Sequence, residues 1–390
     1  DIGALAGCPD SLTGRLLAQP LRHPLLPPRP VKAARRLHIT GARLNNLRGL
    51  DANLPLERLV CITGVSGSGK STLIREVLVN SLRQHLERRR AGGRIGARQR
   101  HACSGLRGWE TIERVLEVDQ TPIGKTPRSC PATYIGIWDP IRRLFAATAE
   151  ARIHGWSAGR FSFNTRQGRC AECEGQGVQR VEMSFLPDVK MRCEACAGQR
   201  FDPETLSVRY GGASIGEVLE MSVERAAALF EAHPAIHHPL RLLQDVGLGY
   251  ITLGQHSPTL SGGEAQRIKL VAELAKARPG FKRQPPATLY VLDEPTVGLH
   301  MADVERLIRV LHQLVEAGHS VIVIEHNLDL IAEADWIIDM GPEGGAEGGR
   351  IVVQGRPQQI ARATAKSHTG RALAGHLGRS GPRNPDRTSG

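Results

Sequence analysis

The feature that most constrains the fold is the glycine-rich segment GVSGSGKS at residues 64–71. It follows an apolar stretch at 59–63, which predicts a buried strand, and precedes residues 73–86, whose apolar side chains recur at helical spacing. A strand, a G-x-x-x-x-G-K-S loop and a helix form a phosphate-binding loop, because the glycines let backbone N–H groups face phosphate oxygens at the helix start. The predicted nucleotide-binding residues are Gly64, Val65, Ser66, Gly67, Ser68, Gly69, Lys70, Ser71 and Thr72.

The residues that would act on a bound nucleotide follow from this loop and from a second strand. Lys70 is expected to reach the β- and γ-phosphates, and the Ser71 hydroxyl is expected to ligate Mg²⁺. The apolar stretch 289–292 ends in Asp293 and Glu294. We expect Asp293 to hold the same Mg²⁺ and Glu294 to polarise the attacking water, as in other P-loop ATPases. The predicted cofactors of the site are therefore ATP and Mg²⁺.

Two further motifs narrow the class of ATPase. The stretch 320–324 predicts another buried strand, and His326 just after it is interpreted as a γ-phosphate sensor. The segment LSGGE at 260–264 precedes a predicted helix at 264–276, so its backbone N–H groups would form a second anion site. These motifs occur in the order of an ABC-type ATPase, in which LSGGE completes the nucleotide site of a partner unit. The residues predicted to act there are Ser261, Gly262, Gly263 and Glu264.

Strands and helices alternate over residues 288–339, which predicts an α/β fold with a mostly parallel sheet covered by helices on both faces. We expect this P-loop ABC-type ATPase domain to be interrupted by a helical signature subdomain that carries a four-cysteine zinc module at 161–205. The predicted domains are a linker or remnant of an upstream half at 1–36, an ATP-binding lobe at 37–121, the signature domain at 122–259, an ABC lobe with the signature helix at 260–362 and a disordered tail at 363–390.

Two C-x-x-C pairs predict a metal site. Cys170 with Cys173, and Cys193 with Cys196, match the spacing of a structural zinc site, and four thiolates leave no open position for catalysis. A redox role is disfavoured because no thioredoxin-like pattern surrounds the pairs. The stretch CAECEGQG at 170–177 is similar to the repeats of DnaJ-type chaperones, but the HPD motif of their J-domain does not occur.

Charge and hydropathy indicate the kind of partner. The net charge of +12 favours an acidic partner such as nucleic acid. No apolar run approaches the ~18–20 residues that a membrane helix needs, and no signal-peptide pattern occurs. The cysteine usage fits a reducing compartment. We therefore expect a cytoplasmic protein without a membrane partner.

Longer segments resemble one family. FSFNTRQGRCAECEGQG (161–177), DVGLGYITLGQHSPTLSGGEAQRIKL (245–270) and VIVIEHNLDLIAEADWIIDMGPEGG (321–345) resemble UvrA, the ATPase family of the ABC excinuclease. The resemblance covers about residues 37–360 and matches the C-terminal ABC half of that family. It implies the damage-recognition ATPase of bacterial nucleotide excision repair, which binds damaged double-stranded DNA as a dimer. Such an ATPase hands lesions to a UvrB-type protein and is not itself the nuclease.

The resemblance also implies roles for particular residues. Gln120, in VDQTPIGKTPRS, resembles the Q-loop glutamine that couples the nucleotide state to the signature domain. The segment 177–191 between the cysteine pairs resembles part of a DNA-contacting zinc finger. The implied phosphate contacts are Arg180, Lys190 and Arg192. Ala171, Cys130 and Val297 depart from the usual Glu, Asn and Thr, and none of these changes removes a ligand.

Other functions stay open. A UvrA paralogue that gives drug resistance would share all of these motifs, and a DNA-binding remnant without ATP turnover is a third hypothesis. The presence of Lys70, Ser71, Asp293 and Glu294 argues against the remnant. The resemblance leaves out the N-terminal ABC half, the UvrB-binding domain and the insertion domain. We therefore expect a fragment whose ATP site requires homodimerisation or pairing with another ABC half.

Overall fold

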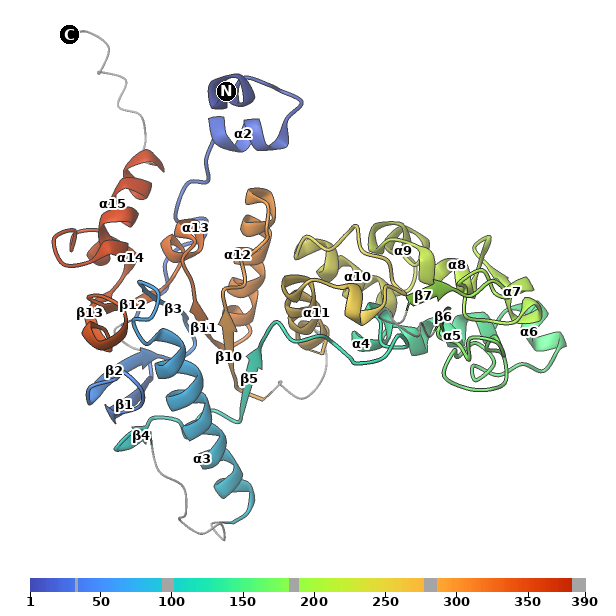
Figure 1. Cartoon of the computed structure of the whole chain (residues 1–390), viewed down its shortest axis with the longest axis horizontal. Helices are drawn as coiled ribbons and strands as arrows, with labels where there is room; N and C mark the ends of the chain where they lie inside the picture. The colour runs from blue at the N-terminus through green and yellow to red at the C-terminus, as the bar shows by residue number, and fades with distance from the viewer. Residues whose placement is uncertain (32–33, 93–101, 182–188, 277–285, 381–390) are drawn as a thin grey trace. The chain divides into compact units, whose positions relative to one another are not determined.

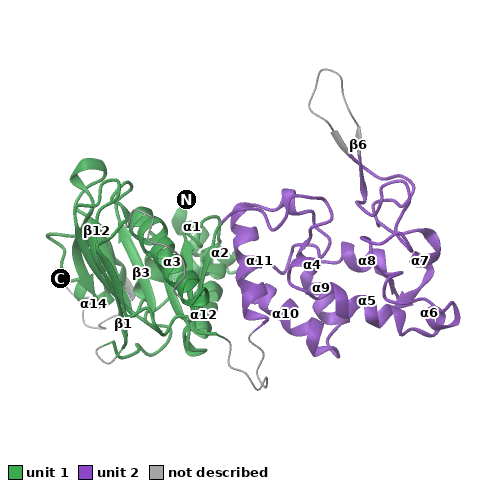
Figure 2. Ribbon diagram, turned by 90° about the horizontal axis from the view of Figure 1, so that it is seen from below, with its two compact units in different colours: residues 1–119, 284–390 green, residues 120–283 purple. Residues whose placement is uncertain are grey.

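The computed structural model describes residues 1–31, 34–92, 102–181, 189–276 and 286–380. The chain forms two compact units, residues 1–119 with 284–390 and residues 120–283, which are green and purple in Figure 2. The first unit is thus built from both ends of the sequence, and the second is a single insertion within it.

The first unit contains a six-stranded sheet, seen in Figure 1, made of β3 (Leu59–Gly64), β5 (Arg114–Val118), β10 (Thr288–Asp293), β11 (Ser320–Ile324), β12 (Trp336–Gly341) and β13 (Arg350–Gly355). The strand order is β13-β12-β3-β11-β10-β5, and all neighbours are parallel except β12 and β13. All residues of β3 and β11 are buried, which is typical of parallel strands covered on both faces. A separate antiparallel sheet, β2-β1-β4, consists of β1 (Arg36–Ala42), β2 (Leu50–Pro55) and β4 (Gly105–Arg107).

Helices cover both faces of the larger sheet. They are the π-helical η1 (Thr72–Val79), α3 (Asn80–Arg90), α12 (Met301–Glu316), α13 (Leu328–Ala332), α14 (Pro357–Ile360) and α15 (His368–Ser380). The unit also contains α1 (Ile2–Ala6), which packs against α2 (Leu12–Ala18), and the 3-10 turn η3 (Gly345–Glu347); α2 packs in turn against α12. Val60 and Ile62 of β3 belong to the same buried cluster as Leu73 of η1. Cys61 points to the opposite face, where its Sγ lies 4.0 Å from the carbonyl oxygen of Leu330 in α13. The side chains of β3 therefore alternate between two helical layers.

The parallel strands determine where polar residues gather. Strands β3, β10 and β11 end at Gly64, Asp293 and Ile324. The carboxyl ends of parallel strands share one edge of a sheet, where α/β proteins bind their ligands. The phosphate loop, the acidic pair and His326 therefore come together in the first unit.

The second unit is mainly helical. It contains α4 (Pro131–Tyr134), α5 (Trp138–Ala146), α6 (Ala149–Ile153), α7 (Pro203–Ser207), α8 (Ile215–Glu220), α9 (Val223–Leu229), α10 (Pro234–Asp245), the 3-10 turn η2 (Ser257–Thr259) and α11 (Gly262–Leu274). Two short antiparallel pairs join β6 (Val178–Val181) to β7 (Val189–Arg192) and β8 (Arg209–Tyr210) to β9 (Ala213–Ser214). Its core contains the fully buried phenylalanines Phe145, Phe161, Phe163, Phe201 and Phe230.

The structure confirms the fold class predicted from the sequence. A mostly parallel α/β unit is interrupted by a helical unit that contains the four cysteines.

Some elements differ from what the sequence predicts. The sequence predicts one helix over residues 214–232, but the structure has two, because Met221 is extended and Ser222 caps α9. The tail expected to be disordered contains α15, in which Leu373 is fully buried. Helix α11 belongs to the second unit, where it packs against α4 and α10. No helix among the described residues is both long and apolar enough to cross a membrane.

Candidate nucleotide site and cysteine cluster

The phosphate loop has the backbone conformation that its glycines permit. Gly64, Gly67 and Gly69 have φ values of 130°, 73° and 98°, which side-chain-bearing residues rarely adopt. A Cβ atom at Gly64 would lie 2.0 Å from the carbonyl oxygen of Met340 on the neighbouring strand. The loop therefore needs glycine at position 64 for both its conformation and its packing.

Lys70 lies across this loop. Its Nζ donates hydrogen bonds to the carbonyl oxygens of Gly64 (2.8 Å) and Val65 (2.9 Å). An ammonium group has three donors, so one N–H remains beyond these two bonds. Burial lowers the pKa of Lys70, while the nearby carboxylates of Glu294 and Asp293 act in the opposite direction. The ammonium is thus a preformed positive centre at the loop.

The hydroxyl residues of the loop have different surroundings. Ser68 is fully buried, and its Oγ has no hydrogen-bond partner among the described residues. Ser71 is exposed at the start of η1, and the Oγ1 of Thr72 accepts a hydrogen bond from Asn45 at 3.3 Å. A buried donor without a partner is costly, so an anion in the loop would suit Ser68. These observations fit the predicted triphosphate.

Asp293 stands at the end of β10 within an ion-pair network that sequence reasoning missed. Arg75 of η1 contacts Asp293 at 3.4 Å and also bonds to Glu117 of β5. Burial raises the pKa of Asp293, Arg75 lowers it and Glu294 raises it again. No motif marks Arg75. It reaches Asp293 from η1, while the parallel pairing of β5 with β10 places Glu117 opposite Val291 on the strand that carries the predicted Mg²⁺ ligand.

Glu294, the residue predicted to polarise the attacking water, and His326, the predicted phosphate sensor, lie next to each other. The Nε2 of His326 is 3.7 Å from Oε1 of Glu294, and both side chains are about half exposed. Glu294 has a φ of 45°, and its N–H donates to the carbonyl oxygen of Ile324 at 2.9 Å. Non-glycine residues at positive φ cost energy and cluster at functional sites.

Glu325 is a second residue that sequence reasoning gave no role. It is only 2% exposed, and its carboxylate accepts hydrogen bonds from both the N–H and the hydroxyl of Thr296. The same carboxylate accepts from the backbone N–H groups of His326 and Asn327. It thus links the segment after Glu294 to the segment that carries His326. The sequence did contain a signal for Glu325, namely an acidic residue directly after a buried apolar strand.

The LSGGE segment lies in the second unit and starts helix α11. Ser261 Oγ accepts from the N–H of Glu264 at 3.3 Å, and the Glu264 carboxylate accepts from the N–H of Ser261 at 2.7 Å, which is a capping box. Tyr250 also donates to Glu264. A Cβ atom at Gly262 would lie 3.0 Å from the Cβ of Gln120, so Gln120 packs against the helix start. The predicted roles of Gly263 and of the other residues here in a nucleotide site stay predictions.

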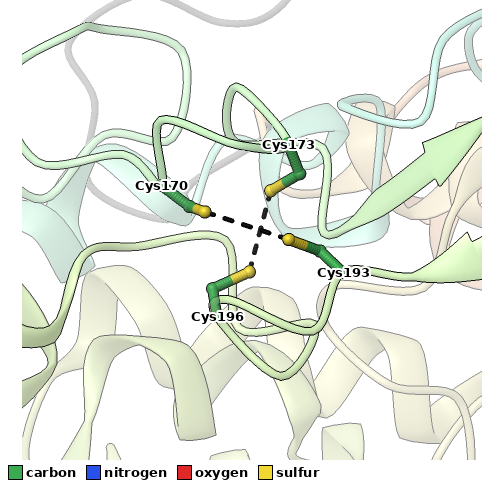
Figure 3. A group of neighbouring side chains, drawn as sticks. All are labelled: Cys170, Cys173, Cys193 and Cys196. Carbon is green, nitrogen blue, oxygen red and sulfur yellow. Dashed lines mark hydrogen bonds between the residues drawn. The ribbon is translucent and has the colours of Figure 1, made fainter.

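The four predicted metal ligands come together, as Figure 3 shows. Their sulfur atoms all lie within 4.8 Å of one another, with Cys170 Sγ 3.9 Å from Cys193 Sγ and Cys173 Sγ 3.7 Å from Cys196 Sγ. Tetrahedral zinc with Zn–S bonds of about 2.3 Å separates its sulfurs by about 3.8 Å. The cysteines are at most 6% exposed. The donor set therefore fits a closed zinc site with four thiolate ligands.

The predicted DNA contacts lie on the hairpin between the cysteine pairs. Arg180 of β6 is paired with Lys190 of β7 in the backbone register, and the side chains of both lie outside the described part of the structure. Arg192 is 66% exposed at its side chain and forms a 2.8 Å ion pair with Glu220. A phosphate at Arg192 would therefore compete with this surface pair.

No family model matches the chain. The chain is 50% identical over 374 residues to UvrABC system protein A of Mycobacterium tuberculosis and 49% identical over 370 residues to that of Aquifex aeolicus, and it is covered to 95% in both comparisons. It spans only 37% and 38% of those proteins. The crystal structure of UvrA2 from Deinococcus radiodurans matches 96% of the chain and 43% of that protein, with a TM-score of 0.83 and 45% identity.

Proposed function

Since the chain is homologous to UvrA proteins over almost its whole length, we propose that it is an ATPase segment of the bacterial nucleotide excision repair system. In this proposal it recognises damage in double-stranded DNA and passes the lesion to a UvrB-type protein, and it works in the cytoplasm. The proposal includes the ATP-binding lobes, the signature domain and the site residues predicted above. The observation that carries it is the convergence of Lys70, Asp293, Glu294 and His326 at one sheet edge.

The residues of the first unit have complementary tasks in ATP hydrolysis. The loop N–H groups and Lys70 bind the β- and γ-phosphates and stabilise the charge that develops on them. Mg²⁺, held by Ser71 and Asp293, would neutralise phosphate charge when bound. Glu294 orients and polarises the attacking water. His326 contacts both Glu294 and the γ-phosphate and so keeps them in the correct relative position.

The LSGGE segment supports a mechanism that needs two ABC units. Its helix N-terminus offers backbone N–H groups to an anion, and it would complete the nucleotide site of a partner copy or of another ABC half. The cysteine cluster would hold zinc and fix the hairpin that carries Arg180, Lys190 and Arg192. These residues would contact DNA phosphates, which position the protein without reading bases.

A pair of variants tests the ATPase assignment. Lys70→Ala should lose ATP binding and hydrolysis, because nothing else in the loop supplies its charge. Glu294→Gln should keep ATP binding but lower the hydrolysis rate by about 10²–10⁴-fold, since it retains shape and loses the base. Nucleotide binding and turnover are measured with duplex DNA present. Lys276→Ala is the control, because it also removes a lysine, but an exposed one in the second unit that pairs with Glu273. Equal loss of ATP binding in both variants would contradict the assigned roles.

A UvrA paralogue is the second candidate, because the matched crystal structure is of a protein called UvrA2. Both candidates predict the same ATP chemistry and differ in their DNA substrate. Binding to a duplex with one bulky lesion, compared with binding to the undamaged duplex and to an intercalator-treated duplex, separates them. Preference for the lesion together with capture of UvrB supports the repair function, and preference for intercalator-treated DNA without UvrB capture supports the paralogue.

A further inference from the structure

A second group of metal-ligating side chains lies in the first unit and has no part in the proposed ATP chemistry. His23 comes from the segment before β1, Asp329 from α13 and His376 from α15. Their candidate ligand atoms all lie within 4.8 Å of one another. Three segments that are distant in the sequence therefore bring two imidazoles and one carboxylate to one place.

The distances in this group suit a metal ion. Oδ1 of Asp329 is 2.9 Å from Nε2 of His23 and 3.0 Å from Nε2 of His376. A divalent ion bound to nitrogen and oxygen at about 2.1 Å separates adjacent ligands by about 3.0 Å in octahedral geometry and about 3.4 Å in tetrahedral geometry. The nitrogen–oxygen separations match the octahedral spacing and are about 0.4 Å shorter than the tetrahedral one, and small rotations of the imidazoles would admit the ion.

The surroundings orient the first histidine. Nδ1 of His23 lies 2.6 Å from Oε1 of Glu333, a carboxylate that also accepts from the N–H of Leu25 at 2.6 Å. The side chain of His23 is 0% exposed and that of Glu333 is 1% exposed. A carboxylate on the far nitrogen fixes the tautomer and aims Nε2 at the metal, as is usual for metal-bound histidines.

A cavity of about 270 Å³ adjoins the group. Asp329 and His376 line it together with Leu16, Leu17, Pro20, Leu21 and Met301. Water in this cavity can fill the coordination positions that the three side chains leave open, as in zinc sites with three protein ligands. The apolar wall keeps the bound ion away from competing polar groups.

We propose that His23, Asp329 and His376 bind a divalent transition-metal ion of the zinc type. Two imidazoles with one carboxylate form a donor set for such ions rather than for Ca²⁺ or Mg²⁺, which prefer all-oxygen ligands. The ion would tie the segment around His23 and the helix α15 to α13. Since Asn327 caps α13 directly after His326, the metal would also steady the segment that carries the predicted phosphate sensor.

Zinc stoichiometry of the whole chain tests this proposal. The protein is saturated with Zn²⁺, freed of loosely bound metal by gel filtration and analysed for zinc, and the wild type should hold two ions per chain. Cys173→Ser should hold one, and so should His376→Ala and Asp329→Asn, because each loses a ligand of one site only. Glu333→Gln should weaken the second site by about 10–100-fold in a zinc titration, since it removes only the orienting carboxylate.

The matched control is His368→Ala on the same helix, because His368 is 56% exposed and contacts Glu343 instead. It should keep both ions. Far-ultraviolet circular dichroism and thermal unfolding verify that each variant is folded. If His376→Ala unfolds, Asp329→Asn still tests the site, because asparagine keeps the size and polarity of the native residue. The same three side chains could instead share protons as hydrogen-bonded ion pairs. One zinc ion per chain in both the wild type and His376→Ala would establish that alternative and overturn the metal site.

Discussion

A single buried carboxylate organises the polar end of strand β11. Glu325 receives hydrogen bonds from Thr296, His326 and Asn327, and among these donors are three backbone N–H groups. Buried charged hydrogen bonds of this kind are strong, and losing one partner leaves costly unpaired groups. At the scale of the residue, the relative position of Glu294 and His326 therefore depends on Glu325, which has no predicted catalytic role of its own.

We expect Glu325→Gln to disturb this arrangement without removing a nucleotide ligand. The amide replaces one acceptor oxygen with a donor, so at least one backbone N–H loses its partner, and the free energy of unfolding should fall by about 1–3 kcal/mol. The ATP hydrolysis rate should fall while the affinity for ATP changes little. Denaturant unfolding and steady-state kinetics measure the two effects. Glu305→Gln in α12, where Glu305 pairs with Arg309, is the control, and equal behaviour of the two variants would refute the role of Glu325.

At the scale of the element, strands and loops with local signals were predictable from the sequence, and elements set by distant contacts were not. The stretches 59–63 and 320–324 form β3 and β11, because continuous apolar runs need burial on both faces. Helix α15 was missed because its sequence is rich in Arg and Gly, and only packing of residues such as Leu373 stabilises it. Arg75 and Glu325 were missed for a related reason, since Arg75 pairs with Asp293 on a distant strand and Glu325 bonds to Thr296, which is 29 residues away.

The cysteine cluster gives a prediction at this scale. Cys173→Ser should lose the zinc of this site and should locally unfold the loops that lead into β6 and β7, because bound structural zinc contributes folding energy. Amide hydrogen exchange of the second unit should accelerate at residues 170–200, while exchange in β3 and β11 stays unchanged. Cys103→Ser is the control, since Cys103 is buried in the core of the first unit. Retained zinc in the four-cysteine site of Cys173→Ser would assign the ligands elsewhere.

At the scale of the whole molecule, a net charge of +12 predicts how DNA binding responds to salt. Each neutralised phosphate releases counterions, so affinity for duplex DNA should fall steeply as salt rises. Replacing Arg180, Lys190 and Arg192 together by Ala should make the slope shallower by up to about three units. Fluorescence anisotropy across a salt series measures the slope. A matched triple, Arg209, Arg306 and Arg309 to Ala, removes the same charge from other exposed sites. An equal change of slope in both triples would reject a specific hairpin contact.

Completion of the ATP site by a second ABC unit gives another whole-molecule prediction. If LSGGE acts on the nucleotide of a second copy, the ATPase rate per chain should rise with protein concentration until the dimer saturates. Ser261→Ala should lower the plateau, because it removes the cap that shapes the start of α11. Steady-state rates measured over about a 100-fold concentration range, with sedimentation velocity in parallel, provide the test. A constant rate per chain would exclude the shared site.

The position of β3 in the sheet has a consequence for synthesis on the ribosome. Its neighbours are β11 and β12, so Leu59 pairs with Val321. At about 5–20 residues per second, the strand waits roughly 15–60 s for both neighbours to be translated. During that interval the fully buried strand β3 lacks both of its neighbours, whereas the inserted second unit is completed before either neighbour is translated. Translation speed and chaperone supply in the host would therefore govern the yield of active protein, even where the finished fold is stable.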